Sequence, residues 1–299
     1  MTLITDLTTP CSPTWCPGCG DIAIWAAFKN AAVAKDWNDT NTVLTAGIGC
    51  HGHMLNYVKI TSAEGLHGRA LPLATGIKMA NNRLNVFVFT GDGDSLAEGG
   101  NHFVNTCRRN HDITVILHDN AVYALTTGQT SPSSPHGFKS KSTPFGNIDE
   151  PISPVTLAIA SGATFVAREY ASHIPQLSKL IAKANDHNGT AIIDVLQPCL
   201  TYNDLYTHEF YQANTYYLPE DYDVTSQTKA FEKSLEWARL PSPEDEVNGG
   251  QGEKKIPLGI FYQVERPSYE DQIPQIAEKP LVDNPPTKKD LLEIFKKYS

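Results

Sequence analysis

The sequence lacks the features that would place the chain in a membrane or on nucleic acid. No run of 18 apolar residues occurs, and the first 16 residues contain neither the basic nor the apolar segment of a secretory signal. Lysine and arginine, 24 in all, are outnumbered by 33 aspartates and glutamates, and a net charge of −9 disfavours a nucleic-acid surface. We therefore expect a cytoplasmic protein that binds neither nucleic acid nor a membrane.

Cysteine pairs are scarce as well. Of six cysteines, only Cys16 and Cys19 form a CxxC motif, whereas zinc ribbons usually bring two such pairs. The C-x₂-C-x₂-C-x₃-C-P run of bacterial ferredoxins is also missing. At the start of a predicted helix, a single CxxC can be a redox dithiol, half of a zinc site or half of an iron–sulfur site. Its spacing leaves all three open.

Short apolar runs alternate with helical patterns through most of the chain. This alternation predicts an α/β fold with a mostly parallel sheet and helices on both of its faces. The predicted strands cover residues 42–46, 86–89, 113–117, 164–167 and 190–196. The predicted helices cover residues 21–35, 70–80, 151–161 and 173–185, and a further helix is expected directly after Asp94.

Beyond residue 205 the pattern is less regular. We expect residues 1–205 to form the α/β domain and residues 206–299 to form a C-terminal extension that packs on the domain or on a partner subunit. Within the extension, the sequence predicts a helix over 223–238, a polar loop over 240–255, a strand over 256–264 and an amphipathic helix over 288–298.

Two successive predicted strands end in polar residues. Gly91, Asp92, Gly93 and Asp94 follow the first strand, and Asn120 follows the second. Because the carboxyl ends of parallel strands meet at one edge of the sheet, these residues should lie side by side where α/β proteins bind ligands. The glycines let a ligand approach closely, the following helix offers free N–H groups to an anion, and carboxylate and amide oxygens suit Mg²⁺. The sequence therefore predicts a site for Mg²⁺ and a diphosphate.

The spacing between these residues is specific. Between Gly93 and Asn120 lie 26 residues, from Asp94 to Asp119. Gly-Asp-Gly followed by Asn at about this interval is the signature of thiamine diphosphate enzymes, which this segment resembles. The alternative is a Gly-Asp-Gly turn with an unrelated asparagine, and the flanking strands and helix argue against it.

Further residues are candidates for the same edge. Cys50 lies in a glycine-rich turn after the strand at 42–46, and Cys199 follows a later strand. His67 precedes a helix of small residues, so it could reach a cofactor phosphate or ring. The alternatives are a buried thiol for Cys50 and a surface turn histidine for His67. Residues 130–150 form a long connection without periodicity, which we expect to cross the cofactor mouth or to meet a partner chain.

Four cysteines, Cys16, Cys19, Cys50 and Cys199, are predicted near one edge of the sheet or in the loop before it. Four thiolates can hold a 4Fe–4S cluster or a structural zinc ion, and the spacing alone does not choose. The predicted thiamine diphosphate favours the cluster. Its decarboxylation chemistry releases electrons that a redox centre can take and a closed zinc site cannot.

Taken together, these motifs resemble the β subunit of 2-oxoacid:ferredoxin oxidoreductases. The resemblance covers about residues 12–205 and includes 256–267. The matching segments are WCPGCG at 15–20, GIGC at 47–50, LHGR at 66–69, GDGD at 91–94, GNHF at 100–103, HDN at 118–120, TTGQ at 126–129 and DVLQPC at 194–199.

This resemblance implies a thiamine diphosphate domain that holds one 4Fe–4S cluster, with His67 as the catalytic residue. The implied cluster ligands are Cys16, Cys19, Cys50 and Cys199. The implied Mg²⁺ ligands are Asp92, Asn120 and the carbonyl of Val122. The residues expected to line the cofactor are Ile48, Gly49, Cys50, His51, His67, Gly91, Asp92, Gly93, Asp94, Asn120, Val122, Leu125 and Thr126.

The resemblance also implies an activity and partners. A 2-oxoacid, CoA and oxidised ferredoxin would be converted to acyl-CoA, CO₂ and reduced ferredoxin, with the electrons passing through the single cluster. A larger α subunit would supply most substrate and CoA contacts, in a heterodimer that pairs into a dimer of heterodimers. We expect 2-oxoglutarate as the substrate, with pyruvate next. His53 stands where some relatives carry a lysine, and this departure bears on the substrate preference.

Two other functions remain open from the sequence. A non-catalytic scaffold subunit could have kept the fold and bind one zinc ion through its cysteines. A thiamine-dependent decarboxylase or carboligase without redox chemistry could carry the cysteines incidentally, and it would turn over without an electron acceptor.

Overall fold

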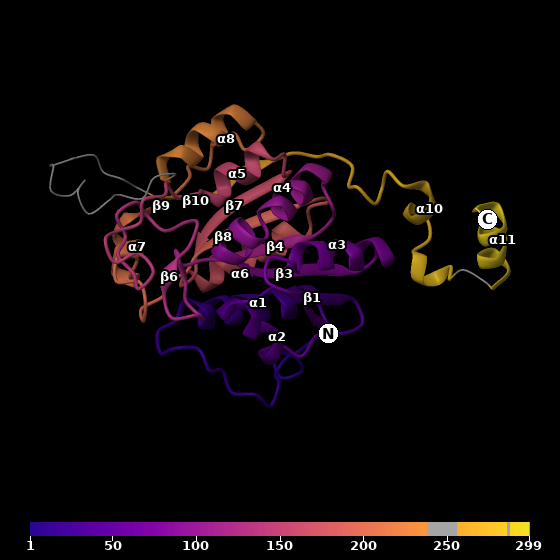
Figure 1. The fold of residues 1–299 in the computed structure, drawn as a ribbon, viewed down its shortest axis with the longest axis horizontal. Coiled ribbons are helices and arrows are strands. Elements are labelled where there is room, and N and C mark those ends of the chain that lie inside the picture. Colours follow the sequence, from indigo (N-terminus) through magenta and orange to yellow (C-terminus); the bar gives the residue numbers. More distant parts are fainter. Residues whose placement is uncertain (238–255, 286–287, 299) are drawn as a thin grey trace.

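The computed structural model describes residues 1–237, 256–285 and 288–298, which contain an eight-stranded sheet (Figure 1). Its strands are β1 (Thr42–Ala46), β2 (Ser62–Glu64), β3 (Asn85–Gly91), β4 (Thr114–Asp119), β7 (Phe165–Tyr170), β8 (Ala191–Leu196), β9 (Thr215–Tyr217) and β10 (Ile256–Gln263). They lie in the order β2-β1-β3-β4-β8-β7-β10-β9. All neighbours are parallel except β7 and β10. The predicted mostly parallel sheet is confirmed.

Helices cover both faces of this sheet (Figure 1). The helices are α1 (Gly20–Lys35), α2 (Met54–Tyr57), α3 (Ala70–Ala80), α4 (Gly100–Arg109), α5 (Pro154–Ala160), α6 (Ile174–Asn185), α7 (His208–Asn214), α8 (Gln227–Ser234), α10 (Pro274–Ala277) and α11 (Lys288–Tyr298). None in the described part of the chain is long and apolar enough to cross a bilayer.

Alternate side chains of the strands build two separate cores. On β3, Phe87 and Phe89 face α1 and α6, and the ring of Phe28 meets both edge to face at 5.1 and 5.2 Å. Val86 and Val88, which point the other way, pack in the core formed with α3, α4, α5 and α8. Burial on both faces explains why the strands read as continuous apolar runs.

Three neighbouring strands end at one level of the sheet. The parallel register pairs Gly91 of β3 with His118 of β4, and the end of β4 with the end of β8. The residues that follow these strands, Asp92, Asn120 and Gln197, therefore emerge side by side at the carboxyl edge. This register is what positions the site described below.

The helix predicted directly after Asp94 begins with an irregular turn. Asp94–Glu98 form a π-helical turn, and α4 begins at Gly100. The segment before α3 packs closely against this turn, since a Cβ added to Gly68 would lie 2.3 Å from the carbonyl carbon of Glu98. A helical segment thus follows the Gly-Asp-Gly-Asp turn as predicted, but its first turn is π-helical and the regular α-helix covers Gly100–Arg109.

Part of the C-terminal extension packs on the α/β domain. It contributes β9 and β10 to the edge of the sheet and α8 to one helical layer. Neither β9 nor α7 was predicted, and the helix expected over 223–238 is shorter, with a 3₁₀ turn at Leu235–Trp237 after α8. The loop predicted over 240–255 lies outside the described residues. Helices α10 and α11 lie apart from the sheet (Figure 1).

Candidate active site

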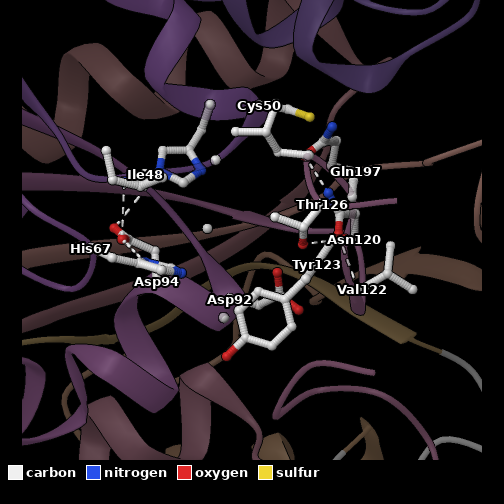
Figure 2. Close-up of a pocket in the computed structure, with 16 residues that line it drawn as sticks. Ile48, Cys50, His67, Asp92, Asp94, Asn120, Val122, Tyr123, Thr126 and Gln197 are labelled. Carbon is white, nitrogen blue, oxygen red and sulfur yellow. Dashed lines mark hydrogen bonds and ion pairs between the residues drawn. The ribbon is translucent and has the colours of Figure 1, made fainter. Parts of the chain in front are cut away.

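A pocket opens at the carboxyl edge of β3 and β4 (Figure 2). The turn after β1, the segment before α3, the turn after β3 and the β5–β6 hairpin (Val122–Tyr123 and Gln129–Thr130) surround it. The structure brings together every residue that the sequence predicted to line the cofactor. These are Ile48, Gly49, Cys50, His51, His67, Gly91, Asp92, Gly93, Asp94, Asn120, Val122, Leu125 and Thr126.

Asp92 is a buried carboxylate directly after β3. It is 2% exposed and accepts hydrogen bonds from the hydroxyls of Ser131 and Ser133, the latter at 2.6 Å. Burial raises the pKa of Asp92 above its ordinary value, although the two hydroxyls act against this. No basic side chain in residues 1–237, 256–285 and 288–298 forms an ion pair with it. A divalent cation would stabilise the ionised form of such a carboxylate.

The chain after β4 brings two more oxygen donors to the pocket. Ala121 has a left-handed backbone conformation, φ 57°, which turns the chain sharply behind the strand. The side-chain oxygen of Asn120 accepts the N–H of Val122 at 3.1 Å. Gly93 makes room for this segment, because a Cβ there would lie 2.2 Å from the ring of Tyr123. One carboxylate, one amide oxygen and one carbonyl oxygen form the type of donor set that Mg²⁺ prefers.

Asp94 organises the opposite wall of the pocket. It accepts four hydrogen bonds, from His67 Nδ1 (2.6 Å), the N–H of Gly68 (2.7 Å), the N–H of Ile48 (3.1 Å) and the Thr90 hydroxyl (2.7 Å). Burial alone would raise the pKa of Asp94, but His51, the N–H of Gly68 and the hydroxyl of Thr90 together hold the pKa below its ordinary value. Asp94 is therefore an ionised acceptor at neutral pH, with its neighbours locked around it.

His67 reaches the pocket from the segment before α3. Its Nδ1 is bound to Asp94, its Nε2 lies 3.6 Å from a carboxylate oxygen of Glu98, and its ring meets Tyr123 edge to face at 6.0 Å. The side chain is 35% exposed. These contacts place the ring on the pocket wall and argue against a free surface histidine.

A second cavity, of about 180 Å³, adjoins the first. Cys16, Cys19, Cys50 and Cys199 all line it, and so does His53. The CxxC turn, the turn after β1 and the segment after β8 meet there. Gly18, with a φ of 77°, allows the CxxC turn to pack against Leu200, whose side chain would lie 2.8 Å from an added Cβ. The tertiary structure thus gathers thiols from three distant segments.

Three of these thiols, those of Cys19, Cys50 and Cys199, have a raised pKa and need a nearby positive charge to ionise at neutral pH. Burial raises the pKa of Cys50 to about 12, with Asp21 and the neighbouring thiols adding to the effect. Burial and the carboxylate of Asp21 also raise the pKa of Cys19. In the described part of the chain, no three His, Cys, Asp or Glu side chains converge as single-ion ligands. Thiols spread around a cavity fit a cluster of several atoms better than one closely held zinc ion.

Three side chains at this edge of the sheet are not predicted by the sequence. Ser131 and Ser133 bind Asp92 from the long connection, and Gln197 lines both cavities. The connection was predicted to cross the cofactor mouth, but its serines gave no sign that they are buried. Gln197 stands beside Cys199 in the sequence, and that proximity was the available signal.

Comparisons with known proteins assign the class. The C-terminal TPP-binding domain of thiamine pyrophosphate enzymes matches residues 47–195. The C-terminal segment of pyruvate ferredoxin oxidoreductase beta subunits matches residues 199–278. The fold and the pocket therefore define a thiamine diphosphate-binding domain of an oxidoreductase subunit, as predicted.

Similar proteins narrow this assignment. The 2-oxoacid:ferredoxin oxidoreductase subunit beta of Saccharolobus solfataricus is 44% identical over 287 residues, which are 91% of this chain and 88% of that protein. The 2-oxoglutarate synthase subunit KorB of Methanocaldococcus jannaschii is 36% identical, over 89% of this chain and 93% of that protein. A solved 2-oxoglutarate:ferredoxin oxidoreductase from Magnetococcus marinus, with 2-oxoglutarate, coenzyme A and succinyl-CoA bound, superimposes with a TM-score of 0.86 at 30% identity, covering 100% of this chain and 96% of that chain.

The chain belongs to the family of 2-oxoacid:ferredoxin oxidoreductase β subunits. Members of this family are oxidoreductase subunits that act with an α partner. The predicted family, fold and thiamine diphosphate-binding domain are confirmed.

Proposed function

We propose that this chain and its α subunit catalyse the CoA-dependent oxidative decarboxylation of 2-oxoglutarate to succinyl-CoA and CO₂, with ferredoxin as the electron acceptor. Thiamine diphosphate and Mg²⁺ occupy the first pocket, and a 4Fe–4S cluster occupies the cavity of the four thiols. The supporting observation is that Cys50, Ala124, Leu125 and Gln197 line both cavities. When bound, thiamine diphosphate supplies the nucleophilic carbon for decarboxylation, and the cluster accepts electrons one at a time.

The residues of the chain orient these groups. Asp92, Asn120 and the carbonyl of Val122 hold the cation, and the hydroxyls of Ser131 and Ser133 fix the carboxylate of Asp92 in place. Leu125 and Thr126, from the hairpin, cover the cofactor beside them. Cys16, Cys19, Cys50 and Cys199 are the cluster ligands.

His67 is the catalytic residue of this proposal. Its Nδ1–H donates to ionised Asp94, so Nε2 is the nitrogen that can accept or deliver a proton within the pocket. His67→Gln keeps one polar end and should lower kcat by roughly 10²-fold or more while the enzyme still binds its cofactor. Equal kcat values for the variant and the wild type would remove His67 from this role.

The preference for 2-oxoglutarate rests on relatives. The proteins from Archaeoglobus fulgidus and Methanocaldococcus jannaschii are named 2-oxoglutarate synthase subunits, whereas those from Saccharolobus solfataricus and Aeropyrum pernix carry the broader 2-oxoacid name. His53 lines the thiol cavity and not the pocket of Asp92. A histidine at this position, where some relatives carry lysine, would therefore influence substrate preference from the side of the thiol cavity.

The proposal is tested with the chain copurified with its α subunit, in the presence of CoA and a viologen dye. We expect a higher kcat/KM for 2-oxoglutarate than for pyruvate, and the reverse order would overturn the substrate assignment. A colourless protein with one zinc ion would support the scaffold alternative. Decarboxylation without any electron acceptor would support the non-redox alternative.

The assembly belongs to the same proposal. We propose a cytoplasmic heterodimer that pairs into a dimer of heterodimers, in which residues 1–205 form the cofactor domain and residues 206–299 extend from it. Size measurement of the copurified complex by light scattering tests the stoichiometry, and a complex with unequal numbers of the two subunits would contradict it.

A further inference from the structure

Gln197 lies between the two cavities and belongs to both. It is the first residue after β8 and is 1% exposed. Its backbone N–H donates to the carbonyl of Asp119 at 2.8 Å, and the next carbonyl, of Pro198, accepts the N–H of Gly20 at 3.2 Å. The main chain on each side of the side chain is therefore held in place, once by β4 and once by the CxxC segment.

The side-chain amide of Gln197 makes contacts in two directions. Nε2 donates to the sulfur of Cys19 at 3.5 Å, and Oε1 accepts from the amide nitrogen of Asn120 at 3.4 Å (Figure 2 shows the second residue pair). The orientation follows from the neighbours. Because the oxygen of Asn120 accepts the N–H of Val122, its NH₂ group faces Gln197, which leaves the nitrogen of Gln197 to face the sulfur.

The CxxC segment is shaped to accept this side chain. A Cβ on Gly20 would lie 2.6 Å from Cγ of Gln197, so a residue with any side chain at position 20 would push the glutamine away from the sulfur. The packing of Gln197 therefore explains why a glycine follows Cys19. It lets the stem of Gln197 pass against the start of α1.

The charge state of Cys19 decides the strength of the contact. As a thiol, Cys19 donates to the carboxylate of Asp21 at 3.4 Å. As a cluster ligand it is a thiolate and has no proton to donate, so that bond is lost and the carboxylate, which also holds His118 at 2.6 Å, repels it. The N–H of Gln197 then becomes a charge-assisted donor to the sulfur.

We propose that Gln197 is a positioning residue that raises the midpoint potential of the cluster through its hydrogen bond to Cys19 and couples this potential to the cation site through Asn120. The inference rests on the proposed function. Reduction adds negative charge to the cluster and its thiolates, so a donor to one sulfur favours the reduced state. A cation on the oxygen of Asn120 polarises its NH₂ group toward Gln197, and the polarised chain of hydrogen bonds strengthens the donor to the sulfur.

The experiment is a redox titration of the cluster in the copurified complex, followed by its electron paramagnetic resonance signal. Gln197→Met keeps the length of the side chain and removes both polar ends, whereas Gln197→Glu keeps the acceptor for Asn120 and removes the donor to sulfur. We expect both variants to hold iron and to have a more negative midpoint potential than the wild type. Addition of Mg²⁺ and thiamine diphosphate should raise the wild-type potential and raise that of Gln197→Met by less.

The matched control is Gln227→Met, which removes a glutamine amide of α8 that donates to the carbonyl of Ile159 in α5, outside the lining of both cavities. This variant should titrate like the wild type. A wild-type potential in both Gln197 variants would overturn the inference. So would loss of iron from both variants, since the proposed hydrogen bond adjusts a cluster that four thiolates already hold. Absence of the cluster from the wild type would instead reject the proposed function.

Discussion

The two cavities lie at the same edge of the sheet, but their polar side chains differ in how far the protein prepares them to bind a ligand. In the cofactor pocket, Asp92 and Asp94 already have their hydrogen-bond donors in place, two hydroxyls for the first and four donors for the second. In the thiol cavity, burial raises the pKa of Cys19, Cys50 and Cys199, so these three side chains stay protonated unless a positive charge lies beside them.

This difference predicts how strongly the structure of each site depends on the group that binds there. The cofactor pocket is preorganised by the protein, so the loss of one residue should damage that pocket and leave the thiols intact. The thiol cavity is shaped by the fold, but its buried thiols need a positive charge before they ionise, so we expect the integrity of this site to depend on the proposed cluster. The following substitutions test whether each site keeps its bound group when the other site is damaged.

The largest effect is expected for Cys199→Ala. A cluster with three thiolate ligands is exposed at one iron, so the complex should lose its iron and its absorption near 400 nm. Thiamine diphosphate binding, measured by isothermal titration calorimetry, should stay within about twofold of the wild type, because this residue lines the thiol cavity and not the cofactor pocket. Loss of both groups together would show that the two sites are a single unit.

Asp92→Ala is the converse experiment. Removal of the carboxylate should weaken binding of Mg²⁺ and thiamine diphosphate by about 100-fold or more, since even outer-shell partners cost 10–100-fold. Iron content should be unchanged. Thiamine diphosphate at wild-type occupancy in this variant would refute the assignment of Asp92 as a metal ligand.

Asp94→Asn tests the preorganised wall through stability. The amide cannot accept all four donors and turns its own NH₂ group toward some of them, so we expect the free energy of unfolding to fall by about 3 kcal/mol. The matched control, Asp186→Asn, removes a partly exposed carboxylate that pairs with Lys35 at 2.6 Å and should cost less than about 1 kcal/mol. Chemical denaturation of the copurified complex measures both values.

The stability difference for Asp94 also has a defined pH dependence. The folded-state pKa of Asp94 lies below its unfolded value, so its contribution is present above the unfolded pKa and is lost as the pH falls toward the folded one. The gap between wild type and Asp94→Asn should therefore shrink as the pH falls below about 4, the ordinary aspartate pKa. A gap that widens in acid would mean that Asp94 is protonated in the folded chain.

The smallest effect is expected for Ser133→Ala. Its hydroxyl contacts Asp92 at 2.6 Å and Asp119 at 2.7 Å, and its removal should weaken Mg²⁺ binding by about 10-fold. Ser140→Ala, in the same connection but bound to Ser142 and Thr143, is the control and should bind Mg²⁺ as the wild type does. Equal affinities for both variants would show that Ser133 does not support the cation site.

Much of the cofactor pocket was predictable because it is local. Asp92 and Asn120 each stand directly after an apolar run, and consecutive parallel strands linked by one helix lie side by side. The later start of α4 was not predictable, since the π-helical turn at Asp94–Glu98 depends on the close approach of Gly68 from another segment. The same holds for Ser131 and Ser133, whose burial depends on the path of a connection without periodicity.

Residue order alone was sufficient for the longer strands, the Gly-Asp-Gly turn and the candidate ligands, because periodicity and turn chemistry act over a few residues. The short edge strands β2 and β9 were not predicted. The sheet order placed β8 beside β4, and this pairing brought Gln197 next to Asn120 across a long gap in the chain. Local sequence patterns cannot predict that contact. It depends on which strands pair, and strand pairing is decided by the burial of both faces of the sheet as a whole.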